Sequence, residues 1–123
     1  MKGNQYMSKY DIEGLSVKIG AEIEEMAVLF SLYLEEMKSE LSLMERFCVE
    51  SDWVMLQRTV HNVKGVSANL DISDMFEAAE QLDSSLKRNE TGMAAPMIGK
   101  IKDLFMNAEE DIKRFFLQRG CSL

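Results

Sequence analysis

The residues whose types and spacing could do chemistry lie together on one short stretch of this chain. His61 is the only histidine in 123 residues, and Lys64, Gly65 and Ser67 follow it at i+3, i+4 and i+6. A neutral imidazole offers a ring nitrogen that can attack a phosphoryl group. Lys64 could balance the charge of the transferred group, and Gly65 leaves room for another protein to close over the ring. The spacing therefore favours a site that carries phosphate on nitrogen.

Each of these residues also has an ordinary interpretation. A lone surface histidine is most often a solvated side chain, Lys64 is a common kind of helix-surface cation, and an isolated Gly65 is a tolerated defect. We favour the chemical interpretation because these residues coincide on one predicted helix with the hydroxyl of Ser67.

A regular apolar row predicts the helix that positions His61. The row spans residues 52–70 at steps of three and four, which marks a buried helix face. It consists of Trp53, Leu56, Val60, Val63, Ser67 and Leu70. At about 100° per residue, His61 lies roughly 130° from the centre of this row and Gly65 lies nearly opposite it. Both are expected on the outside, where a helix glycine costs roughly 1 kcal/mol relative to alanine.

Similar rows predict the rest of an all-α fold, an up-and-down four-helix bundle with a short N-terminal helix or cap. The expected short helix covers residues 12–19. The expected long helices run from about Ala21 to Cys48, over 52–70 after a cap at Ser51 or Asp52, from a cap at Asp71 or Ser73 to Lys87, and from about Pro96 to Gln118. The predicted organisation is a loosely ordered segment at 1–10, the bundle at 11–119 and a tail at 120–123.

Asp83 interrupts the apolar row of the third long helix. It lies about 50° from the centre of that row. A carboxylate at the edge of a core is costly unless it finds a hydrogen-bond donor. The ring of His61 is a candidate donor, so the sequence predicts that these two helices pack side by side.

Composition narrows the class of function. The formal net charge of −7 and the isoelectric point near 4.7 argue against nucleic acid as a partner, because nucleic acid favours a basic face. No apolar run is long enough to span a membrane, and no secretory signal is visible. Cys48 and Cys121 lack the spacing of a zinc site or a disulfide framework. We therefore expect one cytoplasmic domain that binds proteins and holds no metal.

The pattern His61-x-x-Lys64-Gly65-x-Ser67-x-x-Leu70 resembles the phosphorylation motif of histidine-containing phosphotransfer domains, the carrier modules of multistep two-component relays. The sequence at 11–15, followed by Ile19-Gly20, resembles the lead-in to the first long helix of such domains. The resemblance covers most of the chain. Asp71 stands where glycine is usual in these domains.

The resemblance implies a carrier whose His61 accepts a phosphoryl group from the aspartate of one receiver domain and passes it to another. It implies that Asp83 holds the imidazole, that Lys87 contacts the phosphate, and that Gln57 and Ala68 belong to the docking surface. The implied partners are response-regulator receiver domains and a hybrid sensor histidine kinase. The carrier is expected to be a monomer without a cofactor, and the receiver is expected to bring Mg²⁺. Neither a P-loop nor a glycine-rich nucleotide motif is found, so no kinase activity is expected.

Two other classes of function compete with this prediction. One is a helical adaptor that binds a partner through an exposed apolar patch and never carries phosphate. The other is a bundle with a carboxylate-bridged metal pair, which needs Glu-x-x-His motifs on two helices. The single His61 makes the metal bundle the weaker alternative.

Overall fold

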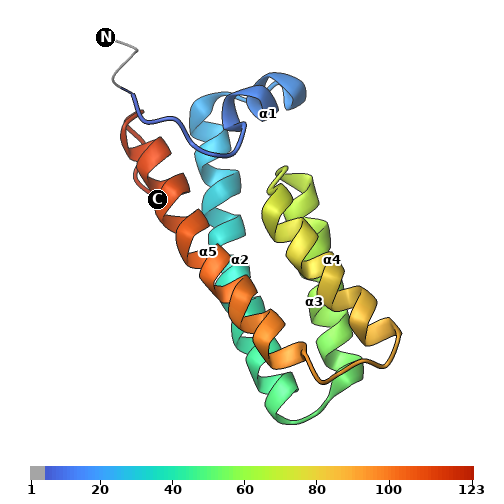
Figure 1. Cartoon of the computed structure of the whole chain (residues 1–123). Coiled ribbons are helices and arrows are strands. Elements are labelled where there is room, and N and C mark those ends of the chain that lie inside the picture. Colours follow the sequence, from blue (N-terminus) through green and yellow to red (C-terminus); the bar gives the residue numbers. More distant parts are fainter. Residues whose placement is uncertain (1–4) are drawn as a thin grey trace.

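The computed structural model describes residues 5–123, and within this range the chain forms five helices and no strand (Figure 1). The helices are α1 (Ile12–Ile19), α2 (Ile23–Val49), α3 (Trp53–Asn69), α4 (Ser73–Lys87) and α5 (Ala94–Leu117). Helices α2 and α4 each pack against both α3 and α5, so the four long helices enclose one core. Successive long helices run in opposite directions (Figure 1). The predicted up-and-down bundle with a short N-terminal helix is confirmed.

The helix ends show which predicted caps form. The side chain of Asp52 accepts a hydrogen bond from a backbone N–H in the first turn of α3, as one of the two predicted caps. The prediction that Asp71 or Ser73 caps α4 is wrong, because the N-cap residue is Ile72 and makes no side-chain cap. Asp71 instead has a φ of 55°, a left-handed conformation that glycine adopts at little cost.

The two pairs of helices differ in length, which leaves room at one end of the bundle. Helices α2 and α5 have 27 and 24 residues, whereas α3 and α4 have 17 and 15. Helix α1 lies across the end at which α2 and α5 extend further (Figure 1) and buries Ile12 and Leu15. In the part of the chain that the structure describes, no helix has the length and apolarity needed to cross a bilayer.

The segment before α1 is fixed by contacts with distant helices. Tyr10 is buried, and its hydroxyl donates a hydrogen bond to Asp74 at the start of α4, 3.1 Å away. The hydroxyl of Tyr6 donates to Asp111 on α5. In the described part of this segment, polar side chains without a helical period find specific acceptors. The expectation that the segment is loosely ordered stays a prediction. Residues 1–4 lie outside the described residues.

Candidate functional site

His61 lies on the exposed flank of α3 that borders α4. The fully buried Leu56, Val60 and Val63 fix the rotation of α3 and turn His61 outward. The prediction that His61 is exposed is confirmed. His61 lines an open hollow of about 460 Å³, whose other lining residues are Val54, Gln57, Arg58, Asp83 and Lys87.

Gly65 keeps the surface one turn after His61 free of side chains. It is exposed, and a Cβ atom added to it would meet no atom within 4 Å. The glycine is therefore not required by packing inside the domain. That its small size serves a molecule approaching from outside stays a prediction.

Asp83 is a buried acid at the base of this hollow. Its side chain is 1% exposed, and its Oδ2 accepts hydrogen bonds from Lys87 Nζ at 2.9 Å and from Lys64 Nζ at 3.1 Å. Burial alone would raise the pKa of Asp83, but the hydrogen bonds from Lys87 and Lys64 outweigh burial and hold the pKa below its ordinary value. Asp83 Oδ1 is buried and accepts no hydrogen bond from any described residue.

The predicted hydrogen bond from the ring of His61 to Asp83 is not formed among the described residues. Two ammonium groups bind the carboxylate instead, and charged donors make stronger hydrogen bonds than a neutral ring N–H. His61 and Asp83 nevertheless line the same hollow. Packing of α3 beside α4, which the prediction required, is confirmed.

Lys64 points toward α4 and already has two acidic partners. Its side chain is 15% exposed, and Nζ lies 2.6 Å from Glu80 Oε2 and 3.1 Å from Asp83 Oδ2. Hydrogen bonds to Glu80 and Asp83 raise the pKa of Lys64. The charge expected to balance a phosphoryl group is thus engaged in the unmodified protein. The sequence did not single out Glu80 as a partner of Lys64, because the other acids of the same helix look equally suitable.

Ser67 does not belong to the hollow. It is fully buried, and its hydroxyl lies 2.9 Å from the hydroxyl of Tyr33 on α2, within hydrogen-bonding distance. Burial raises the pKa of Tyr33, so its hydroxyl stays protonated and able to donate. The expectation that Ser67 contributes to the phosphate site is wrong, because its place in the apolar row turns it into the core.

The remaining predicted residues line hollows on the surface of the α3–α4 pair. Gln57 is half-buried in the His61 hollow, and Lys87 is 57% exposed there. Ala68 is exposed and lines a separate hollow with Phe76. Sequence reasoning also missed Arg58, which is exposed in the His61 hollow and forms no ion pair with a described acid. Its place three residues before His61 was the available signal.

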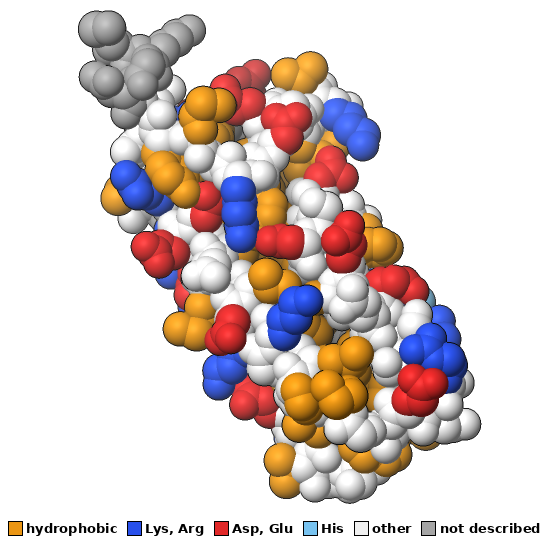
Figure 2. Space-filling model, in the orientation of Figure 1, with side chains coloured by type: hydrophobic (Ala, Val, Ile, Leu, Met, Phe, Trp, Pro, Cys, Tyr) orange, Lys and Arg blue, Asp and Glu red, His pale blue; other side chains and the backbone are white. Residues whose placement is uncertain are grey.

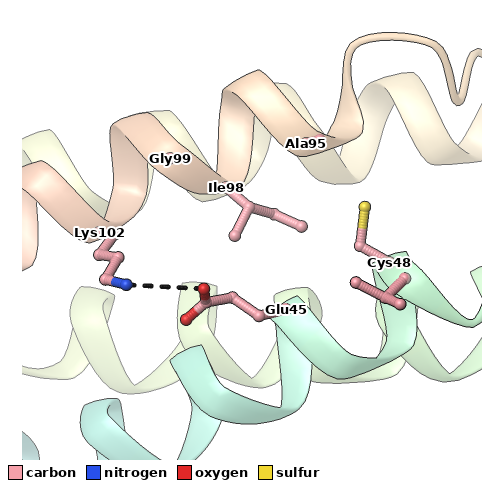
Figure 3. Close-up of a pocket in the computed structure, with 7 residues that line it drawn as sticks. Glu45, Cys48, Ala95, Ile98, Gly99 and Lys102 are labelled. Carbon is pink, nitrogen blue, oxygen red and sulfur yellow. Dashed lines mark ion pairs between the residues drawn. The ribbon is translucent and has the colours of Figure 1, made fainter.

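A second hollow of about 200 Å³ lies where α2 ends and α5 begins, near which hydrophobic side chains gather on the surface (Figure 2). Figure 3 shows Ile98 and Gly99 of α5 facing the end of α2. Cys48 lines this hollow, and Glu45 pairs with Lys102 at 3.6 Å. Its charged groups neutralise each other, and it contains no histidine. Within residues 5–123, no group of three His, Cys, Asp or Glu side chains could hold a metal ion.

The chain was compared with models of known protein families. Residues 28–111 match the Hpt domain. Because this match covers more than half of the chain, the protein belongs to the Hpt domain family, as its motif predicted. Hpt domains are phosphotransfer carriers of two-component phosphorelays rather than kinases. Searches of curated proteins and of solved structures gave no match.

Proposed function

We propose that His61 accepts a phosphoryl group from the aspartyl phosphate of a receiver domain and passes it to the aspartate of another. The observation that carries this proposal is the position of the only histidine of the chain, which is exposed and lines the same hollow as the buried Asp83. One oxygen of Asp83 accepts no hydrogen bond from the described residues. A hybrid sensor histidine kinase is the proposed source of the first receiver. We also propose, as the family resemblance implies, that the carrier acts as a monomer.

The transfer needs a neutral ring with one free nitrogen. The electron pair of that nitrogen forms the N–P bond, while the P–O bond to the receiver's aspartate breaks and its electron pair leaves with the carboxylate. The other ring nitrogen keeps its proton, and the phosphorylated ring carries a positive charge. Asp83 lines the same hollow as the ring, and its buried Oδ1 accepts no hydrogen bond from the described residues. We propose that the ring N–H of His61 turns to donate to it, which fixes the reactive tautomer.

The charges of the hollow suit an incoming phosphoryl group. Arg58 and Lys87 bring positive charge to its lining, which favours approach of the phosphoryl oxygens. Gln57 and Ala68 are proposed to contact the receiver, and Gly65 leaves space for it. The Mg²⁺ of the reaction would come with the receiver.

The proposal is tested by incubating the protein with a phosphorylated receiver and mapping the label. We expect one label, on His61, that is lost in acid as phosphoramidates are and is absent from His61→Gln. The exposed His61 contributes no core packing, so His61→Gln should fold normally. A label that persists in His61→Gln, or that survives acid as a phosphoester does, would contradict the proposal. An adaptor that never carries phosphate would bind the receiver and take no label.

A further inference from the structure

Glu80 forms the shortest ion pair in the neighbourhood of His61. Its Oε2 lies 2.6 Å from Lys64 Nζ, and its Oε1 accepts a hydrogen bond from the hydroxyl of Ser84 at 3.1 Å. These hydrogen bonds from Lys64 and Ser84 lower the pKa of Glu80, so the side chain is negatively charged at neutral pH. The carboxylate is therefore held in one place by two donors.

The ammonium of Lys64 can choose between two directions. Lys64 follows His61 by three residues on α3, and side chains at this spacing are neighbours on a helix surface. Its long, flexible stem therefore lets the ammonium reach either the ring of His61 or the acids of α4. In the unphosphorylated protein it points to Glu80 and Asp83.

The two acids differ in how easily they release Lys64. The side chain of Asp83 is 1% exposed and that of Glu80 is 45% exposed. Water can replace Lys64 around an exposed carboxylate, whereas a buried carboxylate that loses its partner pays a large desolvation cost. A phosphoryl group on His61 would bring nearly two negative charges. It would therefore take Lys64 from Glu80 before it could take Lys64 from Asp83.

We infer that Glu80 is a positioning residue that competes with the phosphoryl group of His61 for the ammonium of Lys64. This inference rests on the proposed function. Because the ammonium of Lys64 spends part of the time paired with Glu80, its attraction to the phosphoryl group is weaker. Phosphohistidine is then less favoured, and the carrier returns the phosphoryl group to a receiver more readily. In the return step the N–P bond breaks with its electron pair going to the ring nitrogen, and the receiver's carboxylate forms the new P–O bond.

The test measures the equilibrium distribution of phosphoryl groups between the protein and a receiver domain. Glu80→Gln should shift this distribution toward His61 by about twofold to fivefold, the range that partly exposed ion pairs contribute. Glu77→Gln is the matched control, because Glu77 is an exposed acid of the same helix without an ion pair to any described residue. It removes the same charge and should leave the distribution unchanged. In a Lys64→Met background, Glu80→Gln should have no effect.

Three results would overturn one of the two proposals, and they are distinguishable. Equal shifts in Glu80→Gln and Glu77→Gln would show that only net charge matters. A shift that persists in the Lys64→Met background would show that Glu80 acts on the phosphoryl group directly. Either result removes the inference while His61 remains the acceptor. Absence of label on His61 in the unmodified sequence would instead overturn the proposed function.

Discussion

The α3–α4 pair and helix α5 each contain a buried aspartate, and the two aspartates are used differently. On α5, Asp111 is 7% exposed and accepts hydrogen bonds on both oxygens, from the hydroxyls of Tyr6 and Ser8 and from the backbone N–H of Lys9. On α4, Asp83 is fully buried and accepts from two ammonium groups on a single oxygen. Its second oxygen accepts nothing from the described residues.

Asp111 is therefore a structural acid, whereas Asp83 has one oxygen that could accept a further hydrogen bond. Neutral donors from a single segment surround Asp111, so its carboxylate ties the N-terminal segment to the bundle. The donors of Asp83 are long lysine side chains, and Asp83 lines the same hollow as the only histidine. A buried polar atom without a partner usually has a reason. For Asp83, the donor proposed above is the ring N–H of His61.

The largest effect on stability is expected at Asp111. Asp111→Ala removes the acceptor of three donors, of which the hydroxyls are partly buried, so we expect the free energy of unfolding to fall by about 2–3 kcal/mol. Urea unfolding followed by circular dichroism measures this change. Labelling of His61 under native conditions should be retained. Unchanged stability, or loss of the label in a folded variant, would erase the contrast between the two acids.

At Asp83, substitution is expected to affect phosphoryl transfer strongly and stability only slightly. Asp83→Asn should slow phosphoryl transfer to His61 by roughly tenfold, because the ring loses a charged acceptor that stabilises its positive phosphorylated form. Stability should change by less than about 1 kcal/mol, because removing a buried charge offsets the lost ion pairs. Lys64 keeps Glu80, and Lys87 is exposed to water. Transfer at the normal rate would show that Asp83 serves only the two lysines.

Protonation of Asp83 should also make the free energy of unfolding depend on pH. Hydrogen bonds from Lys87 and Lys64 hold its pKa in the folded protein below the ordinary value, which is about 3.9 for an unfolded chain. Such a group stabilises the fold above the unfolded pKa, and this contribution is lost as the pH falls through the folded pKa. Below about pH 4, the unmodified protein should therefore lose stability more steeply than Asp83→Asn. Parallel curves of unfolding free energy against pH would show that the ion pairs contribute no net stability.

Most of what could be predicted about the fold came from the helical spacing of apolar residues. Each long helix has one apolar row, and rotation of that row toward the core also fixes which residues face water. The exposure of His61 and the burial of Ser67 both follow from the row on α3. The motif suggested that the hydroxyl of Ser67 serves the site, but packing of the row decides where the hydroxyl points.

Contacts that depend on the exact placement of two helices could not be predicted. Glu77 and Glu80 are equivalent acids in the sequence, and only the rotation of α4 against α3 brings Glu80 to Lys64. The contact between Tyr6 and Asp111 joins residues 105 positions apart, and no local sequence pattern predicts it. Asp71 lacks the usual signal of a left-handed residue because it is not a glycine.

The smallest expected effects compare two exposed glycines, Gly65 on α3 and Gly99 on α5. Both lie inside helices, and a Cβ atom added to either would meet no atom within 4 Å. Gly65→Ala and Gly99→Ala should therefore each raise the free energy of unfolding by about 0.5–1 kcal/mol, through higher helix propensity. Only Gly65→Ala should slow phosphoryl transfer, because its methyl group lies one turn from His61.

Gly99 is a close control because the two substitutions have the same effect on the backbone and differ in surroundings. Gly99 faces the hollow between α2 and α5 (Figure 3) and lies outside the lining of the His61 hollow. Transfer rates from a phosphorylated receiver should fall further in Gly65→Gln than in Gly65→Ala, and should stay unchanged in Gly99→Gln. If Gly65→Ala unfolds more easily than the unmodified protein, the glycine is needed by the fold. If transfer slows equally at both positions, clearance above His61 is not what the glycine provides.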